Sequence, residues 1–482
     1  MKKINNFLLA SDCPPGPFNP PNDISEDVWY PSGSSVFPTN YNCVYQINVP
    51  QGWSSFIAVF AIPSSNITNA PIVQVIDFNQ KVENVQYTNH QYSEHDDFYF
   101  IAPGGRIKLS TQTTNVTFRF LVRWYSNITV FKPTFLNVSA SDSQPRIVLA
   151  DRVNCRVTAE TRVSAITLPP NDKGLADNIR NLRSILIFDG PNVNSTCLGS
   201  AYQLLNSNLQ WVSTGKTLTI AQLQPADDVY GFLLAFQDFE NTKEIDQYQV
   251  VGGLNTRSIV MDASKQAAAF STYFYSESSS DCLLNITGTG KLDVYYGGIT
   301  ASKSNLIASY SESSNGANLP QKIRGFFRTY VLTGGIATVQ VGLNSTCGVL
   351  TNNVAGFIAS REYKTNLTFS YPDDYQYYYS NEPFNFTLNV QNVGLSQDES
   401  LQLRITNNKT NVLNVVFSSS KPPTLNTVLS GVGNNMDVVY STPYSNTKNG
   451  FYIDFTATKV KVSAAKSYGF IVICAILWTG LF

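Results

Sequence analysis

The sequence predicts an all-β protein made of several antiparallel β-sandwich domains in series. Helical periodicity is nearly absent, whereas apolar and polar residues alternate repeatedly, most clearly at positions 115–124, where every second residue is apolar. Similar short runs lie at 184–188, 217–223, 230–236, 384–390 and 401–406. Gly, Pro, Asn and Ser bound these runs, and short strands joined by turns favour antiparallel sandwiches over parallel sheets.

Length and composition limit the class of protein. At 482 residues the chain is too long for one hydrophobic core, and about one domain per 100 to 200 residues predicts three or four domains. Charged residues make up only 14% of the chain, against a typical share of about 25%, so the surface is mainly uncharged and polar, as suits a secreted protein. With 33 basic and 34 acidic residues, the chain lacks a basic stripe, and we expect no nucleic-acid partner.

Six of the seven cysteines fall into three successive pairs at domain-sized intervals. The spacing and the secretory features predict disulfides within these pairs, whereas the alternative is six reduced, buried thiols in a cytosolic protein. The predicted pairs are Cys13 with Cys43, Cys155 with Cys197, and Cys282 with Cys347. Cys474 is the odd cysteine and lies in the last apolar run.

The C-terminal residues 468–482 carry no charge but are shorter than the roughly 20 residues of a membrane-spanning helix. The nearby lysines precede this run, which is the reverse of the usual flank of a spanning helix. We therefore assign residues 463–482 to a glycosylphosphatidylinositol-anchor signal, with lipidation at Ser463. The spacer of Lys466 and Ser467 is short, and a transmembrane helix or a buried terminal strand are the alternatives. At the other end, residues 1–11 resemble a degenerate or truncated signal segment, because their apolar run is too short.

The first unit, residues 12–126, carries an ordered set of motifs. Cys13 is followed by Trp29-Tyr30-Pro31, by Tyr41-Asn42-Cys43-Val44-Tyr45 and by Val49-Pro50-Gln51-Gly52-Trp53. This arrangement resembles the amino-terminal domain of the nematode CUB-like protein family. The resemblance implies a CUB-like jelly roll, an extracellular location that can include membrane rafts, and a link to the innate immune response to pathogens.

Three further units follow. The second, residues 137–250, resembles the centre of a CUB module in the run that ends at Asp189-Gly190, but Arg183 occupies the position where calcium-binding members have an aspartate, so we expect no calcium there. The third, residues 257–356, resembles a CUB module more weakly. The fourth, residues 360–462, contains no cysteine and is predicted to be a β-sandwich.

Catalytic and metal motifs are not convincing. The histidines His90 and His95 lie near Glu94, Asp96 and Asp97, yet without a defined third ligand they are better explained as an exposed loop. We expect no catalytic residue, no metal and no cofactor. Paired carboxylates can meet from distant strands, so a secreted glycoside hydrolase-like enzyme stays an alternative.

Ten Asn-x-Ser/Thr sequons are candidate glycosylation sites. Because Asn, Ser and Thr are abundant, chance yields nearly as many, so each requires an exposed strand end or loop. The sites are Asn66, Asn115, Asn127, Asn137, Asn194, Asn285, Asn344, Asn366, Asn385 and Asn408.

Together these features predict a non-enzymatic recognition or adhesion protein. We expect it to be held on the outer face of the plasma membrane by a lipid anchor, or secreted, and to bind an extracellular protein or carbohydrate through loops at the ends of its sandwiches. The alternatives are the hydrolase and a structural surface coat.

Overall fold

The computed structural model describes most of the chain in four successive β units. The described residues are 13–63, 71–85, 95–113, 115–126, 128, 133–150, 153–169, 175–223, 233–252, 256–273, 280–311, 318–343, 347–361, 363–364, 373–441 and 450–460. They form seven sheets in which most neighbouring strands are antiparallel. The predicted all-β class is therefore confirmed. The lipid-anchor signal with Ser463, the signal segment and Cys474 lie outside the described residues.

The first unit is a sandwich of two four-stranded sheets. One sheet has the order β1 (Val28–Phe37), β8 (Val116–Tyr125), β3 (Ser54–Pro63) and β6 (Asp96–Ile101). The other has the order β2 (Asn42–Asn48), β7 (Gly104–Ser110), β4 (Ile72–Ile76) and β5 (Val82–Asn84). The alternating residues of β8 supply one side of the core, where Phe118 and Phe120 pack on Tyr45 of β2. A disulfide joins Cys13 to Cys43.

The second unit pairs a four-stranded sheet with a five-stranded sheet. The first has the order β10 (Arg146–Leu149), β17 (Leu233–Asp238), β12 (Val163–Leu168) and β15 (Trp211–Val212). The second has the order β14 (Thr196–Ser200), β13 (Ile185–Asp189), β16 (Thr217–Gln222), β11 (Cys155–Ala159) and β9 (Thr134–Val138). The 3-10 helices η2 (Leu175–Ser184) and η3 (Phe239–Asn241) and the helix α1 (Ala201–Ser207) complete the unit. Ser200 caps α1 by accepting a hydrogen bond from the backbone N–H of Gln203.

The predicted disulfide between Cys155 and Cys197 is wrong, because both cysteines are free. Two strands, β13 and β16, separate the strands that carry them. Cys155 faces the core of the sandwich, whereas Cys197 lies with Phe188 on the opposite face of the same sheet. Burial raises the pKa of each thiol to about 12, so both stay protonated at neutral pH.

The third unit is again a two-sheet sandwich. One sheet has the order β18 (Ile245–Val251), β20 (Ala267–Tyr273), β25 (Phe327–Thr333), β22 (Lys291–Tyr296) and β23 (Leu306–Ser311). The other has the order β19 (Arg257–Ala263), β26 (Gly335–Leu343), β21 (Asp281–Gly288) and β24 (Gln321–Ile323). Between them Arg328 and Asp281 form a fully buried ion pair at 2.8 Å. A disulfide joins Cys282 to Cys347.

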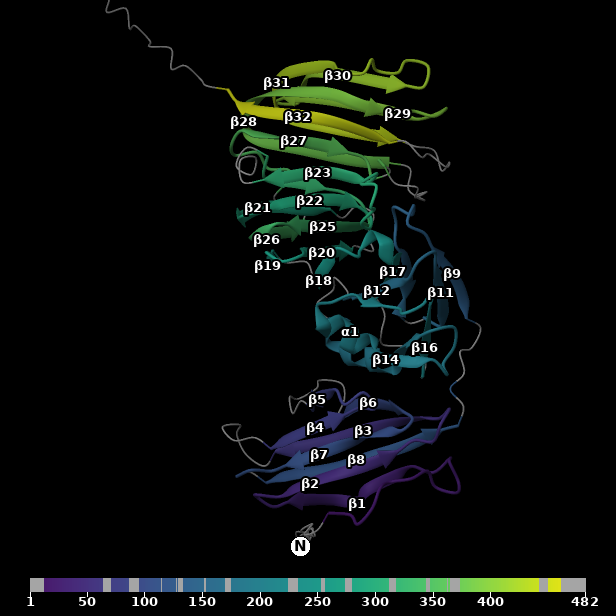
Figure 1. The fold of residues 1–482 in the computed structure, drawn as a ribbon. Helices are drawn as coiled ribbons and strands as arrows, with labels where there is room; N and C mark the ends of the chain where they lie inside the picture. Colours follow the sequence, from purple (N-terminus) through teal and green to yellow (C-terminus); the bar gives the residue numbers. More distant parts are fainter. Residues whose placement is uncertain are drawn as a thin grey trace, which may run out of the picture.

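The fourth unit is one six-stranded sheet that folds over itself. Its order is β27 (Val354–Ala359), β32 (Phe451–Lys459), β28 (Asp373–Val393), β31 (Thr427–Ser441), β29 (Ser400–Asn407) and β30 (Thr410–Ser418). The long strand β28 has a register shift between Tyr379 and Phe384, and the parts on either side belong to different layers. Across the layers the rings of Tyr378 and Phe455 lie 4.9 Å apart. Strands β29 and β30 thus lie over β27 and β32 (Figure 1).

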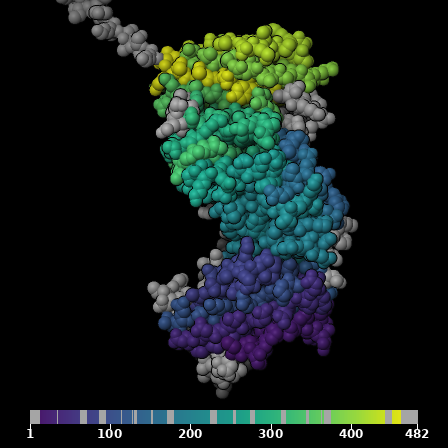
Figure 2. All heavy atoms as spheres, viewed as in Figure 1, coloured from purple at the N-terminus to yellow at the C-terminus, as the bar shows by residue number. Residues whose placement is uncertain are grey.

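Strand pairing places the unit boundaries differently from the sequence. Strand β9 begins at Thr134, before the expected start of the second unit, and β18 pairs within the third unit although the second was expected to reach residue 250. Strand β27 pairs with β32 of the fourth unit. In each case the strand pairs with the sheet that has an open edge next to it. The spacing of turns in the sequence does not indicate which sheet that is. The four units follow one another as bands along the molecule (Figure 2).

Candidate binding groove

Arg183 joins the first two units through a buried ionic contact. Its side chain is only 4% exposed; its Nη1 lies 2.7 Å from Asp96 and its Nε lies 2.7 Å from Glu83, both residues of the first unit. The guanidinium also donates to the backbone carbonyl of Asp97 and lies over the ring of Phe98, 4.0 Å from its centroid. Arg183 stands where calcium-binding CUB modules have an aspartate, and its guanidinium pairs with two carboxylates of the first unit.

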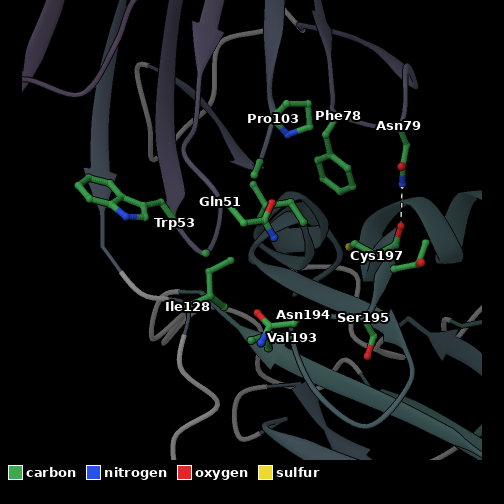
Figure 3. Close-up of a pocket in the computed structure, with 14 residues that line it drawn as sticks. Gln51, Trp53, Phe78, Asn79, Pro103, Ile128, Val193, Asn194, Ser195 and Cys197 are labelled. Atoms are coloured by element: carbon green, nitrogen blue, oxygen red, sulfur yellow. Dashed lines mark hydrogen bonds between the residues drawn. The ribbon is translucent and has the colours of Figure 1, made fainter.

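Further contacts extend this junction beyond Arg183. Gln203 at the start of α1 donates to Asp77 at 2.7 Å, and Asn79 donates to the carbonyl of Cys197 at 3.0 Å (Figure 3). The ammonium of Lys81 lies 5.1 Å from the ring centroid of Trp211. A small apolar cluster around Phe188, Ile101 and Leu186 fills the centre. The two units therefore meet in a packed interface.

A groove of about 580 Å³ opens beside this junction. The first unit contributes three turns from one end of its sandwich, namely those between β2 and β3, between β4 and β5, and between β6 and β7. The second unit contributes the loop that leads from β13 into β14. The lining residues are Gln51, Gly52, Trp53, Phe78, Asn79, Ile101, Ala102, Pro103, Ile128, Val193, Asn194, Ser195, Thr196 and Cys197.

Local sequence explains why these turns form. Gly52 has a φ of +77°, and the N–H of Trp53 donates to the carbonyl of Pro50 at 3.0 Å, so the Pro-Gln-Gly-Trp run closes a tight turn. On the facing loop Gly190 has a φ of +144°, and a Cβ there would collide with Ser195. The motif that carried the family resemblance in the first unit therefore forms one wall of the groove.

The chemistry of the groove is polar but uncharged. None of the fourteen lining residues is charged. Side-chain amides come from Gln51, Asn79 and Asn194, hydroxyls come from Ser195 and Thr196, and Trp53 and Phe78 add aromatic surface (Figure 3). Such a lining suits a neutral ligand with many hydrogen-bonding groups, and it holds no carboxylate pair of the kind that glycoside hydrolysis uses.

The structure divides the residues that the sequence grouped around His95. The His95 Nδ1 lies 2.6 Å from Asp97, and its ring lies 5.1 Å from that of Phe60. Asp96 points to Arg183 instead. His90 and Glu94 lie outside the described residues. In the part of the chain that the structure describes, no group of three or more His, Cys, Asp or Glu side chains is arranged to hold a metal.

The described sequons are all exposed. Asn194 lies in the groove lining, and the others are spread over the four units. The exposed sites are Asn115, Asn137, Asn194, Asn285, Asn385 and Asn408. Asn66, Asn127, Asn344 and Asn366 lie outside the described residues. The described helices include none long and apolar enough to span a membrane.

Sequence reasoning missed the partners of Arg183. Glu83 and Asp96 lie about a hundred residues earlier, on strands of another unit. The only signal was the charge of Arg183 itself, since a guanidinium at the start of a buried strand needs a carboxylate nearby.

Comparisons with known proteins agree with this architecture. Residues 9–127 match the model of the CUB-like domain, and residues 137–223 and 240–344 match two domains of unknown function, DUF7592 and DUF7591. No curated protein matches the chain.

Among solved structures, the CUB1-EGF-CUB2 domain of human MASP-1/3 is 10% identical, with a TM-score of 0.18, over 42% of this chain and 99% of that one. The CUB1-EGF-CUB2 domains of rat MASP-1 are 10% identical, with a TM-score of 0.15, over 43% of this chain and 99% of that one. An archaeal virus turret protein with a triple jelly roll is 10% identical, with a TM-score of 0.15, over 65% of this chain and 80% of that one.

The chain thus carries an amino-terminal CUB-like domain followed by further β units. CUB-like domains are typically non-enzymatic binding modules, and their presence indicates a protein of the extracellular recognition or adhesion type. The two disulfides agree with an extracellular or secreted location.

Proposed function

We propose that this protein is a non-enzymatic recognition protein of the outer cell surface, and that it binds an uncharged extracellular ligand in the groove between its first two units. The carrying observation is the groove itself, which loops from two packed units build without a single charged side chain. The ligand is a carbohydrate or a polar, uncharged protein segment. Resemblance to nematode CUB-like proteins supports a role in the innate immune response to pathogens.

Lipidation at Ser463 is the proposed mode of attachment, and it is consistent with location in membrane rafts. Glycans on the exposed sequons are part of the same proposal. A glycan on Asn194 would stand at the edge of the groove, since this side chain is exposed and belongs to the lining.

The groove is tested by filling it. Gln51 is exposed in the β2–β3 turn, and Gln51→Trp adds a large ring to the lining without removing a buried group. Gln340→Trp on β26 is the matched control, because it makes the same substitution outside the groove. Fluorescent protein, produced with a functional signal peptide, is titrated against bacterial and yeast cells and against an array of neutral oligosaccharides and extracellular proteins.

We expect the unmodified protein to show saturable binding. Gln51→Trp should weaken this binding by about tenfold or more, which is about 1.4 kcal/mol, and Gln340→Trp should leave it unchanged. Equal binding by both variants would refute the groove. A protein without any saturable partner would favour the structural surface coat.

Attachment is tested separately on intact cells. Phosphatidylinositol-specific phospholipase C is expected to release the surface stain. Retention after the enzyme, with an epitope after Phe482 accessible from the cytoplasm, would instead identify a membrane-spanning tail.

A further inference from the structure

Three tyrosines stand exposed in a row on β28 of the fourth unit. Tyr375, Tyr377 and Tyr379 are 46%, 47% and 39% exposed, whereas the residues between them are buried. Their ring centroids are 6.0 and 5.9 Å apart. Exposed aromatic rows of this kind are costly in water and typically mark a binding surface.

The neighbouring strands place polar side chains beside this row. In the sheet register Tyr377 lies opposite Asp437 of β31, and Asp437 lies opposite Arg404 of β29. Gln402 is two residues before Arg404 on the same face. We call these six residues, Tyr375, Tyr377, Tyr379, Asp437, Arg404 and Gln402, the tyrosine face.

Internal contacts hold the polar groups of the tyrosine face in place. Arg404 Nε lies 2.9 Å from one oxygen of Asp437, and the hydroxyl of Tyr375 donates to the other oxygen at 2.9 Å. The ring of Tyr375 therefore leans across the sheet toward β31. Gln402 donates to Asn414 of β30 at 2.8 Å, which fixes the orientation of its amide.

The charge of the tyrosine face cancels internally. Asp437 and Arg404 are its two charged residues, and they neutralise each other. The ammonium of the buried Lys322, from the third unit, lies behind the row, 5.9 Å from the ring centroid of Tyr377. A strongly charged ligand would have to break this pair, whereas a neutral polar ligand can use the remaining N–H groups of the guanidinium, which has five in all. The face thus favours an uncharged partner with many hydroxyl groups.

A sugar ring meets both requirements. One face of a pyranose presents C–H groups that stack on an aromatic ring, and its rim presents hydroxyls that hydrogen-bond to planar amide, guanidinium and carboxylate groups. Tyrosine is well suited to such contacts because it offers a large amphipathic surface and loses little side-chain entropy. Three rings in a row suit several linked sugars better than one.

We propose that the tyrosine face binds an extended, uncharged oligosaccharide. This inference does not depend on the groove, which lies between different units and has its own lining. The tyrosine face lies in the fourth unit, at the opposite end of the molecule from the first unit (Figure 1).

The test uses the full chain displayed on cultured cells through a functional signal peptide. Fluorescent cellohexaose, mannohexaose and chitohexaose are the neutral probes, and glucose and hexagalacturonate are the monomeric and charged comparisons. Binding is measured by flow cytometry and normalised to surface staining, which also reports whether each variant folds well enough to be exported.

Tyr377→Ala is expected to weaken binding of at least one neutral hexasaccharide by about tenfold, while Tyr377→Phe keeps the ring and stays within about threefold. Val432→Ala is the matched control, because Val432 is also exposed on the fourth unit but lies beyond the register shift, in the other layer. It is expected to bind like the unmodified chain. Glucose and hexagalacturonate are expected to bind at least tenfold more weakly than the neutral hexasaccharide.

Several results would overturn the proposal. These are no binding of any neutral hexasaccharide, equal binding by Tyr377→Ala, or binding of hexagalacturonate as tight as that of the neutral probes. Surface cross-linking that shows self-association lost in Tyr377→Ala, without sugar binding, would assign the face to a second copy of the chain.

Gln51→Trp separates this proposal from the groove. Hexasaccharide binding lost in Gln51→Trp but kept in Tyr377→Ala would place the sugar in the groove and refute the tyrosine face. Binding kept in Gln51→Trp and lost in Tyr377→Ala supports the tyrosine face whatever the outcome for the groove.

Discussion

Replacing Arg183 by methionine should destabilise the junction of the first two units strongly. The substitution keeps an unbranched side chain of similar length but removes the charge that two carboxylates share. Asp96 is only 2% exposed, so its carboxylate would stay buried without the partner 2.7 Å away, while Arg180 lies farther off at 3.5 Å. Breaking a buried ion pair by removing one member typically costs about 3–5 kcal/mol, and we expect a loss in this range.

Urea denaturation followed by tryptophan fluorescence measures this loss well. The four tryptophans among the described residues are Trp29, Trp53, Trp124 and Trp211, so their signal reports on the first two units. The matched control is Arg123→Met, which removes an arginine paired with Asp27 inside the first unit.

In that control pair the two side chains are 42% and 28% exposed, and the expected cost is below about 1 kcal/mol. The double variant Arg183→Met with Asp96→Asn should regain part of the loss, since it removes the stranded charge. If Arg183→Met costs no more than Arg123→Met, the buried pair does not stabilise the junction and the reasoning fails.

Three further predictions concern the cysteines and one buried lysine. Cys13→Ala opens a loop closed over a sequence separation of 30 residues and should cost about 3–4 kcal/mol in the same assay, whereas Cys197→Ala should cost less than about 2 kcal/mol. Alkylation of the denatured, unreduced chain should label Cys155 and Cys197, because both are free thiols. Protection of both from alkylation would instead indicate a disulfide between them. Burial, with Arg324 nearby, lowers the pKa of Lys322 from 10.5 to about 8 in the folded state. Below pH 8 the proton is held in both states and the folded state bears the full burial penalty. Between pH 8 and 10.5 the unfolded chain binds more protons, so stability should rise by up to about 3 kcal/mol relative to Lys322→Met. A difference between the two proteins that stays flat over this interval would refute the shift.

The alternation of the sequence was sufficient to predict strands and sandwiches. At positions 115–124 the period of two predicted one buried face, and β8 buries Val116, Phe118, Phe120, Val122 and Trp124 in the first core. The prediction works because one face of each strand is buried in the core. This burial requires an apolar residue at every second position, and that pattern can be recognised within a short stretch of sequence.

Pairing across the sheet could not be predicted in the same way. Ile187 of β13 lies opposite Gly199 of β14, but the next residue, Phe188, lies opposite Cys197, so Leu198 is a bulged residue. Without that bulge Cys197 would lie opposite Asp189 and face the same side as Ile187, toward the core that contains Cys155. One extra residue thus turns the thiol to the other face, and regular spacing of cysteines carries no sign of it.

The candidate sites depend even more on long-range pairing. Tyr375, Tyr377 and Tyr379 alternate visibly in the sequence, but the same alternation describes a buried face as well as an exposed one. The polar residues beside these tyrosines come from β29 and β31. Only the strand pairing of the folded sheet brings them next to the tyrosines. The groove likewise requires two units to meet, and the contact that joins them links residues about a hundred positions apart.

Packed junctions determine how the two proposed sites act together. Units joined by loose linkers move relative to one another, but here each junction has buried polar contacts. Asn305 of the third unit donates to the Ser143 carbonyl of the second, and Arg324 of the third pairs with the buried Asp374 of the fourth. The groove lies directly at the first junction, whereas the tyrosine face lies within one unit. Loss of Arg183 should therefore weaken ligand binding in the groove by displacing its two walls, and it should leave hexasaccharide binding at the tyrosine face unchanged. If Arg183→Met weakens both equally, the two surfaces do not act as separate sites.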